Sequence, residues 1–425
     1  MPEKNRRVVV TGLGILSPNA HGIQDFASAL KKGTSGIRYY PGLKELNFNC
    51  HIAGAPTQDL EALRQQYFTQ DVLTVMKSIV ISYACITAID AWKDAGLTLP
   101  TNDAAADVET GAIMGIGGVS DLVSQAVHRI EAGEIRKMGS TYTEQIMGSC
   151  ISARIAGLLA LGGHVTTMSN ACVTGTEAVI QAFYAIRSGQ AERMLASGSD
   201  APGALQWGSF DAMKVLASKY NDQPERGSRP MSASSSGFVP SSGSGALILE
   251  SLASAEKRGA RIYAEVLGGH INAGGHRMGG SMTRPNYVAA ETCLRQALHK
   301  SGIEGKQIDL INGHLTGTLA DPYEVETWQS VLGIEANAFP WIQSTKSMLG
   351  HTLGAAGAIE CIATVLQLHQ SFIHPSLNCE DLHHRLSDFS TSIPSKSFEE
   401  DIKIAAKSSF GFGDVNACAI FAKFR

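Results

Sequence analysis

Strand-like apolar runs alternate with helix-like segments along nearly the whole chain, and the same alternation occurs twice. In the first half the strand-like runs are RVVVTGLGIL, GAIMGIGG, HVTTMSNA, RMLASGSDA and SGALILE, with helix-like segments such as TEAVIQAFYAIRSG between them. The second half repeats the alternation with IYAEVLGGHIN, IDLINGHL and WIQSTKS, and with helix-like segments at 289–300, from Asp321 onward and up to Gln370. This alternation predicts a largely parallel sheet covered by helices. We therefore expect two comparable α/β halves.

The same pattern predicts the main boundaries along the chain. Residues 72–95 have helical spacing and predict one helix that stops at Gly96. Residues 232–244 are rich in serine and glycine, but an apolar run follows at once, so we expect an ordered loop rather than a linker. The charged stretch AEKRGA separates the two halves, which divides the chain into domains 1–254 and 255–425.

Composition excludes several kinds of partner and site. The 425-residue chain has a formal net charge of -4, so a polyanion such as nucleic acid is not implied as a partner. No apolar run reaches the roughly 18 residues that a membrane-spanning helix needs. The eight cysteines form no C-x-x-C pair and no zinc-like grouping, so we expect reduced thiols, no metal and no cofactor. These features are typical of a cytoplasmic protein.

Cys172 stands between a strand-like and a helix-like run, in TMSNACVTGTEAVIQAFYAI. Gly175 allows a tight turn there, which puts the thiol at a helix N-terminus. Unpaired N–H groups and the positive end of the helix dipole favour a thiolate at such a position and lower its pKa. The alternative is a buried core cysteine, because free cysteine is among the most buried residue types. The local context leaves both interpretations open.

Two histidines occupy matching positions in the second half. His314 ends the run IDLINGH, and His351 lies in QSTKSMLGHTLGAAGAIE, five residues after Lys346. Either histidine alone would more often be a packed or capping residue. Together with Cys172, which lies on a similar strand-to-helix edge of the other half, they indicate one site, because open α/β sheets gather active sites at the carboxyl ends of their strands.

At these residues the sequence closely resembles the beta-ketoacyl-acyl-carrier-protein synthases, the elongating type II condensing enzymes of fatty acid and polyketide synthesis. The elements that carry the resemblance follow the family's order over nearly the whole chain: VVVTGLGILSP, SNACVTG, NGHLTGT, STKSMLGHTLGAAG and SSFGFGDVNA. The resemblance implies the thiolase fold, in which two related α/β halves stack as a five-layer αβαβα sandwich. It also implies a dimer, either of identical chains or with a chain-length partner.

The resemblance further implies a reaction and the residues that carry it. Cys172 would take an acyl group from acyl carrier protein as a thioester. His314 and His351 would bind the thioester carbonyl of a malonyl extender and stabilise the enolate left by loss of carbon dioxide, which then attacks the acyl carbonyl. Lys346 would organise the second histidine, with Glu324 as its acidic partner. The alternative for His351 is general base to Cys172.

Other positions take roles from the same resemblance. The backbone N–H groups of Cys172 and Phe412 would form an oxyanion hole, and Phe410 and Phe412 would gate the pocket. Core packing explains Phe410 equally well. Ile116 and Phe210 would line the acyl tunnel, although both are equally good core residues.

The expected partner is acidic acyl carrier protein, which presents acyl and malonyl groups on phosphopantetheine. A local basic patch suffices to dock it. Arg136, Lys137 and Lys214 match docking positions of the family. For any single one of them, a solvated charged surface is the alternative.

The chain departs from the family pattern in three places. Serines stand where charged residues are usual, at Ser232, Ser235, Ser236 and Ser242. Hydroxyls are therefore expected to replace a buried ion network. Leu315 follows the first histidine where a glycine is usual, and Asp414 replaces a second glycine in the closing loop, which should restrict gate motion. The departures favour a specialised polyene or polyketide pathway over housekeeping fatty acid synthesis.

Two other classes of relative compete with the synthase. A non-catalytic chain-length partner lacks the nucleophilic cysteine, so Cys172 argues against it. A thiolase acting on coenzyme A esters typically uses a second cysteine late in the chain. Cys418 alternates with apolar strand residues in DVNACAIF and is more simply a core residue. The sequence therefore predicts a condensing synthase and leaves its acyl chain length open.

Overall fold

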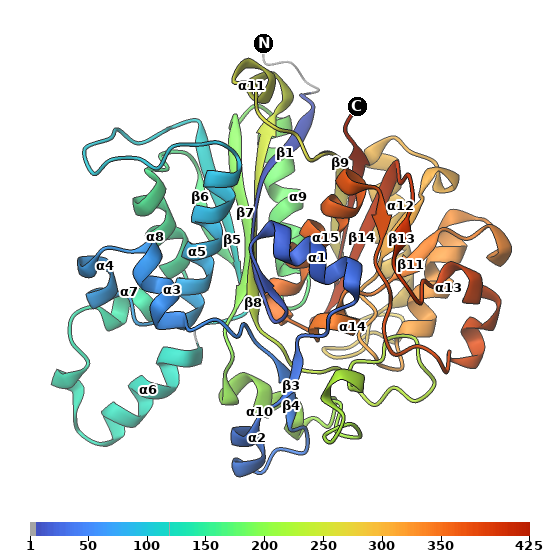
Figure 1. Cartoon of the computed structure of the whole chain (residues 1–425), viewed down its shortest axis with the longest axis horizontal. Helices are drawn as coiled ribbons and strands as arrows, with labels where there is room; N and C mark the ends of the chain where they lie inside the picture. Colours follow the sequence, from blue (N-terminus) through green and yellow to red (C-terminus); the bar gives the residue numbers. More distant parts are fainter. Residues whose placement is uncertain (1–5, 119) are drawn as a thin grey trace.

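The two halves of the chain contain the same succession of strands and helices in the computed structural model, which describes residues 6–118 and 120–425 (Figure 1). The repeated elements of the first half are β1 (Val8–Ser17), α5 (Ile79–Asp94), β5 (Thr110–Ile116), α8 (Cys150–Leu159), β6 (Val165–Met168), α9 (Thr174–Arg187), β7 (Arg193–Asp200) and β8 (Gly243–Ser251). Those of the second half are β9 (Ala264–Ala273), α12 (Tyr287–Ser301), β10 (Leu310–Asn312), α13 (Asp321–Leu332), β11 (Trp341–Gln343), α15 (Ala356–Gln370), β14 (Ile404–Gly411) and β15 (Val415–Lys423).

The strands of both halves join in one 11-stranded sheet. The order β1-β8-β7-β5-β6 in the first half is matched by β9-β15-β14-β10-β11 in the second, and the halves meet where β1 pairs antiparallel with β9. In each half the inner pairings are antiparallel and the outer ones parallel. The expectation of a largely parallel sheet is therefore wrong for the inner strands, because antiparallel neighbours need no helical crossover.

Helices cover both faces of each half and complete five layers. α9 and α15 pack against each other in the middle and contact strands of both halves, while α5 and α8 cover the outer face of the first half and α12 and α13 that of the second. Figure 1 shows α9 and α15 between the two sets of strands. The three largest apolar clusters follow these layers, with one in the centre and one on each outer side. This is the thiolase-like architecture that the resemblance implies.

Shorter elements fill the connections between these layers. They are β2 (Ala20–His21), α1 (Ile23–Lys32), β3 (Ile37–Tyr39), α2 (Pro41–Glu45), β4 (Ile52–Gly54), α3 (Leu60–Tyr67), α4 (Gln70–Val75), α6 (Ser120–Glu131), α7 (Tyr142–Ile146), α10 (Ala204–Ala212), α11 (Leu252–Lys257), α14 (Lys346–Leu349), β12 (Phe372–Ile373) and β13 (Phe398–Glu399). Short 3₁₀ turns, including η1 (Ile135–Lys137), complete the chain. Among the described residues no helix is both long and apolar enough to cross a membrane.

The single helix predicted for residues 72–95 is two helices, α4 and α5. Ser78 caps α5 by accepting a hydrogen bond from the N–H of Ile81, and Gln145 accepts from the N–H groups just before it. A serine at such a position starts a helix rather than continuing one. The predicted stop at Gly96 is confirmed by its positive φ of 72°. The predicted domain boundary after residue 254 falls within α11 and remains a prediction.

The two central helices approach closely because glycines face each other. A β-carbon on Gly175 of α9 would lie 2.3 Å from the backbone nitrogen of Ala358, and one on Gly357 of α15 would lie 2.2 Å from that of Thr176. Neither nitrogen can withdraw without moving a helix. The glycine pair therefore fixes how near the helix N-termini of the two halves come.

We predict that Gly357→Ala lowers the free energy of unfolding by at least ~2 kcal/mol, because the added methyl group meets backbone atoms. Gly157→Ala is the matched control. Gly157 lies in α8, and a β-carbon on it would have no neighbouring atom within 4 Å, so alanine there should raise stability by up to ~1 kcal/mol through its helix propensity. Urea unfolding of both variants is the measurement, and equal stability of the two would contradict the packing argument.

Candidate active site

A cavity of about 780 Å³ opens at the carboxyl ends of strands from both halves. Cys172, His314 and His351 form its inner end, and their sulfur and nitrogen atoms lie within 4.8 Å of one another. Cys172 comes from the β6–α9 connection and His351 from the matching β11–α15 connection. The shared topology of the halves therefore brings together the three residues that the sequence singles out.

The turn that carries Cys172 is sharply bent. Ala171 has a positive φ of 47°, and the hydroxyl of Thr174 closes the turn by accepting from the N–H of Asn170 at 2.7 Å and donating to the carbonyl of Ala171. α9 begins at Thr174, so the thiol lies just before the helix N-terminus. The sequence reasoning therefore locates the thiol correctly.

The expected lowering of the thiol pKa is wrong. Burial raises the pKa of the Cys172 thiol to about 12, although the charge of Lys346 and a hydrogen bond from the backbone N–H of Phe412 act in the opposite direction. The free-energy cost of burying a thiolate away from water exceeds the stabilisation that the helix N-terminus provides. The cysteine is thus a neutral thiol before it reacts.

His351 points directly at the thiol. Its Nε2 lies 3.1 Å from the sulfur of Cys172, and its Nδ1 faces the backbone N–H of Leu353 at 3.3 Å. Because Nδ1 accepts that hydrogen bond, the neutral ring carries its proton on Nε2. Burial, with the charges of Lys346 and Lys407, holds the pKa of His351 well below its ordinary value. His351 is therefore a neutral hydrogen-bond donor at the inner end of the cavity.

His314 lies across from His351, with 5.3 Å between the ring centroids. Burial and the charge of Lys346 hold the pKa of His314 well below its ordinary value too. The loop that carries it is held by backbone N–H groups that converge on two carboxylates in the first turn of α13. Glu324 accepts from the N–H groups of His314 and Leu315 at 2.7 and 2.8 Å.

Asp321 holds the rest of the same loop. Its carboxylate accepts from the N–H groups of Thr316, Gly317 and Thr318. Leu315, at the position where glycine is usual in the family, has a positive φ of 21° and is fully buried. The loop thus keeps a left-handed turn without glycine, supported by two acidic side chains.

The expected pairing of Lys346 with Glu324 is wrong. The ammonium group of Lys346 lies 2.5 Å from Glu360 of α15, and Glu360 also pairs with Lys407 of β14 at 3.0 Å. Glu324 instead accepts from the hydroxyl of Ser408 besides its two backbone donors, and burial raises its pKa. Glu324 therefore positions the His314 loop, while Glu360 balances two buried lysines.

Sequence reasoning missed Glu360, Lys407 and Asp200. Each is the one charged residue in a largely uncharged run, in AGAIECIATV only Glu360, in IAAKSSF only Lys407 and in MLASGSDA only Asp200. Such residues are almost never fully buried without a partner, and that is the signal that could have found them. Asp200 accepts from the N–H of Gly354 at 3.0 Å, next to the residue that orients His351, and burial raises the Asp200 pKa to about 7.

Aromatic rings continue from the histidines along the cavity to Phe412. The ring of Phe238 packs edge-on against His351, Phe210 against Phe238, and Phe412 against Phe210, with centroids 5.3, 5.3 and 6.0 Å apart. Phe410 packs against His314 with centroids 6.1 Å apart. Phe210, Phe410 and Phe412 all line the cavity. The gate role of Phe410 and Phe412 and the acyl-tunnel role of Phe210 stay predictions.

The closing loop is the tight turn of the β14–β15 hairpin, and Asp414 anchors it. Asp414 has a positive φ of 61° and is buried. Its carboxylate accepts from the N–H of Asn286 at 2.8 Å and from that of His276 at 3.0 Å, while its carbonyl accepts from the N–H of Gly274. The aspartate therefore ties the β14–β15 turn to the loop before α12, and the restricted gate motion expected from the sequence stays a prediction.

The remaining predicted positions are scattered. Ile116 is buried in the outer core of the first half and does not line the cavity. Arg136 and Lys137 are exposed on η1 outside the cavity lining, where Lys137 pairs with Glu134. Lys214 is exposed and lines the cavity.

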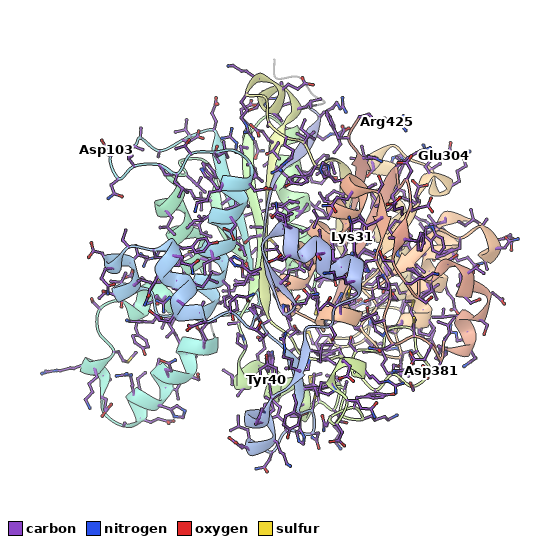
Figure 2. The ribbon with its side chains drawn as sticks, in the orientation of Figure 1. Lys31, Tyr40, Asp103, Glu304, Asp381 and Arg425 are labelled. Atoms are coloured by element: carbon purple, nitrogen blue, oxygen red, sulfur yellow. The ribbon has the colours of Figure 1, made fainter. Side chains whose placement is uncertain are left out.

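The serine-rich loop keeps an ion network, contrary to the expectation that hydroxyls replace it. Arg229, which is 2% exposed, pairs with Glu380 and Asp381 at 2.9 and 2.8 Å. Asp381, labelled at the lower right of Figure 2, also accepts from the hydroxyl of Ser232. Burial acts to raise the pKa of Asp381, but these hydrogen bonds and the Arg229 charge outweigh it and hold that pKa well below its usual range. The charges come from a distant segment, which the local sequence could not indicate.

The other three serines lie elsewhere. Ser235 and Ser236 line the cavity. Ser242 is buried beside β8. Within the described part of the chain, the hydroxyls of Ser236 and Ser242 have no hydrogen-bond partner.

The three residues at the inner end could in principle hold a metal ion, since one cysteine and two histidines are zinc ligands. The N–H of Leu353 opposes this, because it keeps the proton of His351 on the nitrogen that faces the sulfur. Cys418, the second cysteine of the thiolase alternative, lies fully buried in β15, away from the cavity lining. Its position agrees with the interpretation as a core residue.

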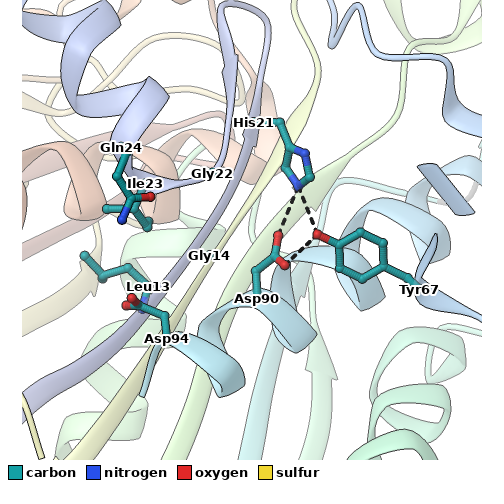
Figure 3. Close-up of a pocket in the computed structure, with 9 residues that line it drawn as sticks. All are labelled: Leu13, Gly14, His21, Gly22, Ile23, Gln24, Tyr67, Asp90 and Asp94. Atoms are coloured by element: carbon teal, nitrogen blue, oxygen red, sulfur yellow. Dashed lines mark hydrogen bonds and ion pairs between the residues drawn. The ribbon is translucent and has the colours of Figure 1, made fainter. Parts of the chain in front are cut away.

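A smaller cavity of about 230 Å³ lies elsewhere, between β1, α1 and α5 (Figure 3). Its polar side chains satisfy one another: Asp90 accepts from Tyr67 at 2.6 Å and lies 3.0 Å from Nε2 of His21. Asp94 is paired with Arg261, outside the cavity lining. The cysteine and the two histidines singled out by the sequence line the larger cavity, not this one.

The chain matches two family descriptions in succession. Residues 5–255 match the beta-ketoacyl synthase N-terminal domain, and residues 263–380 match the beta-ketoacyl synthase C-terminal domain. A 3-oxoacyl-[acyl-carrier-protein] synthase 1 of Haemophilus influenzae is 33% identical over 426 residues, which cover 99% of both chains.

Solved structures agree with these matches. The ishigamide ketosynthase/chain length factor superposes with a TM-score of 0.88 at 29% identity, covering 99% of this chain and 100% of the other. A type II PKS acyl-carrier protein in complex with its ketosynthase bound to the hexaketide gives a TM-score of 0.86 at 28% identity, with the same coverage.

We predict that Glu360→Gln lowers the free energy of unfolding by ~3 kcal/mol at neutral pH, because two buried lysines lose their counter-charge. Burial already lowers the pKa of Lys346, and Glu360 opposes that shift. The folded protein then binds fewer protons than the unfolded one below the ordinary lysine pKa of 10.5, so stability rises with pH in that range. In the variant the pKa of Lys346 should fall further, so the rise of stability with pH should begin at a lower pH. Urea unfolding at a series of pH values measures this rise.

Glu326→Gln is the matched control. Glu326 pairs with Arg385 at a partly exposed position, with 37% of its side chain accessible, so its loss should cost less than ~1 kcal/mol. If the two variants are equally stable, or if the Glu360 variant loses stability as pH rises, the buried lysines do not depend on Glu360.

Proposed function

This chain belongs to the beta-ketoacyl synthase family and is an acyltransferase of the 3-oxoacyl-acyl-carrier-protein synthase type, and we propose that Cys172, His314 and His351 perform its decarboxylative condensation. One observation carries the proposal. A thiol and two neutral imidazoles meet at the inner end of a cavity that, among the described residues, no acidic side chain lines. In such a site the thiol can act as a nucleophile, and the two imidazoles can stabilise a developing negative charge.

In the first half-reaction Cys172 takes over the acyl group. The sulfur attacks the carbonyl carbon of the acyl thioester, the carbon–sulfur bond to the pantetheine arm breaks, and the thiol proton leaves with the pantetheine thiol. His351, with its proton on Nε2, can stabilise the developing thiolate by donating a hydrogen bond. The neighbouring charge of Lys346 acts in the same direction.

In the second half-reaction the imidazoles stabilise an enolate. The malonyl thioester would direct its carbonyl oxygen to His314 and His351, its terminal carboxylate leaves as carbon dioxide, and the bonding electrons move onto that oxygen. Neutral rings suit this step because a neutral imidazole carries one N–H, which can donate a hydrogen bond to the enolate oxygen. Preorganised donors of this kind are commonly worth ~3–4 kcal/mol each in the transition state.

The enolate carbon then attacks the acyl carbonyl on Cys172. The backbone N–H groups of Cys172 and Phe412 would hold the oxygen of the tetrahedral intermediate, which collapses with release of the cysteine sulfur. The new carbon–carbon bond leaves a 3-oxoacyl group on the carrier arm, and the sulfur regains a proton from solvent. We assign the gate to Phe410 and Phe412 and the acyl channel to Phe210, which lines the cavity. Ile116 is buried outside that lining, so it could bound the channel only beyond the cavity.

Within the family we favour polyketide or polyene extension over housekeeping fatty acid synthesis. The altered serine loop and Asp414 support this choice, as does the likeness to a ketosynthase of a type II PKS. The partners we infer are an acyl carrier protein and either a second copy of the chain or a chain-length partner. β6 offers such a partner the partly exposed edge of the sheet. All eight cysteines are free thiols, which fits action in a reducing cytoplasm.

We predict that Cys172→Gln abolishes condensation while malonyl-carrier decarboxylation persists or rises. The amide can occupy the place of the acyl thioester and leaves both imidazoles free to hold the enolate. His351→Ala should show the opposite pattern: it accepts a radiolabelled acyl group at Cys172 but loses at least ~100-fold in decarboxylation rate. Acyl labelling and carbon dioxide release measure the two half-reactions separately.

Cys379→Ser is the control for labelling, since Cys379 is a half-buried thiol outside the cavity. It should be acylated like the parent enzyme. A His351→Ala enzyme that cannot be acylated would make His351 the general base of Cys172. If, in addition, the Cys172→Gln enzyme cannot decarboxylate, then the proposed assignment of acyl transfer to Cys172 and decarboxylation to the histidines is wrong.

We also predict that reversing the charges of Arg136 and Lys137 to glutamate raises the apparent KM for carrier-linked substrate and spares small thioester analogues. Both side chains are exposed and lie outside the cavity, so they can contact the carrier without touching the reacting groups. Reversal of Lys31 and Lys32, an exposed pair on α1 (Lys31 in Figure 2), is the control. Equal effects on both kinds of substrate would reject the docking role.

A further inference from the structure

Asp200 is a buried carboxyl group with no cation beside it. It ends β7 with 1% of its surface exposed, and no lysine, arginine or histidine that the structure describes pairs with it. By contrast, Glu250 and Glu360 are similarly buried and each pairs with two cations. An isolated carboxylate inside a protein is costly, whereas a neutral carboxylic acid costs far less.

The oxygens of Asp200 have few hydrogen-bond donors. Oδ2 accepts from the N–H of Gly354 at 3.0 Å, and the amide nitrogen of Gln206 lies 3.5 Å from it. Oδ1 is buried and has no partner among the described residues, and the same holds for the side-chain oxygen of Gln206. Two neighbouring side chains thus each hold an acceptor oxygen without a donor. One proton on the carboxyl group would give both oxygens a partner.

The hydrogen bond from Gly354 holds a strained turn in place. Leu353 has a positive φ of 50°, which costs free energy for a residue with a β-carbon. Its N–H faces Nδ1 of His351 at 3.3 Å and so keeps the ring proton on Nε2. Asp200 therefore fixes the backbone that sets the tautomer of His351, although Asp200 itself does not line the cavity.

Close packing keeps the carboxyl group against this turn. A β-carbon on Gly117 would lie 1.9 Å from Oδ2 of Asp200, and one on Gly354 would lie 2.4 Å from the backbone nitrogen of Gly117. The three residues therefore touch without intervening side-chain atoms, and the carboxyl group has little room to rotate away from the N–H that it accepts from.

A charge on Asp200 would act on the nucleophile. Burial and, to a smaller extent, the charge of Asp200 raise the pKa of the Cys172 thiol. Burial raises the pKa of Asp200 itself to about 7. At this end of β7 the surrounding elements carry these charged and titratable groups: Tyr83 of α5, Asp121 of α6, Cys172 before α9, Glu177 of α9, Asp211 of α10, Lys346 of α14, His351 before α15 and Glu360 of α15. The sequence of β5 contributes none.

We propose that Asp200 is a positioning residue for His351 and that it acts as a neutral carboxylic acid. In this form one oxygen accepts from the N–H of Gly354, the other carries the proton and donates it to the side-chain oxygen of Gln206, and no negative charge lies behind the thiol. Loss of the proton would place an anion beside the site where a thiolate and an enolate must form. The positioning role rests on the proposed function, whereas the protonation of Asp200 does not.

The first test follows alkylation of Cys172 by iodoacetamide at a series of pH values, read by mass spectrometry of the peptide that contains it. The reagent attacks the thiolate, so the rate rises with pH. For the parent enzyme we expect this rise to flatten around pH 7, where Asp200 ionises. Asp200→Asn cannot ionise. It should match the parent below about pH 6 and react on the order of ten-fold faster above about pH 8.

Asp90→Asn is the matched control for the loss of a carboxyl group. Asp90 lies in the same half, is held by Tyr67 and His21 and does not line the cavity of Cys172 (Figure 3). This variant should follow the parent curve. Cys379, read in the same digests, should show no flattening around pH 7. If the parent and Asp200→Asn are alkylated alike at every pH, Asp200 is not a neutral acid beside Cys172 and the proposal is overturned.

The second test measures decarboxylation of malonyl-carrier protein at about pH 6. Asp200→Leu keeps a side chain of similar size but removes the acceptor, so kcat should fall on the order of ten-fold with KM nearly unchanged, while Cys172 still accepts an acyl group. Asp200→Asn keeps an acceptor oxygen and should keep the parent kcat. An unchanged kcat in Asp200→Leu, or an equal loss in both variants, rejects the positioning role. A parent enzyme that decarboxylates no malonyl thioester would refute the proposed function instead, and the alkylation result would stand.

Discussion

The close approach of α9 and α15 is the constraint on which the rest of the molecule depends. The helices touch through Gly175 and Gly357, where a single methyl group would meet backbone atoms. Each helix follows directly on the connection that supplies one reacting group, Cys172 in one half and His351 in the other. The distance of 3.1 Å between sulfur and imidazole is therefore a consequence of how two helices pack in the middle layer.

Burial sets the chemistry at the point where those helices begin. It keeps the thiol of Cys172 protonated and both imidazoles neutral, since it disfavours every isolated charge. The charges that do remain buried are balanced among themselves, with Glu360 between Lys346 and Lys407. The site thus combines uncharged reacting groups with a fixed positive field behind them, which suits a reaction whose intermediates are anions.

Much of this could be predicted from the sequence, because local motifs determine it. The alternation of elements indicates two α/β halves, and the glycine-flanked strings around Cys172, His314 and His351 place each residue on a strand-to-helix edge. What the sequence could not indicate depends on contacts between distant segments. The partner of Lys346, the carboxylates that hold Arg229 and the pKa of Cys172 all follow from packing that no local pattern describes. The helix break at Ser78 was missed for a different reason, since the apolar spacing continues across it.

The matching strand order of the halves has a consequence for how such a site could arise. A single half that paired with a copy of itself through β1 would present two identical connections side by side at the middle layer. Joining the copies in one chain removes that symmetry, so that one connection can change to a cysteine and the other to a histidine without either change being imposed on both. A fused pair of halves can therefore carry a nucleophile on one side of the cleft and a hydrogen-bond donor on the other, which a symmetric pair of identical halves could not do.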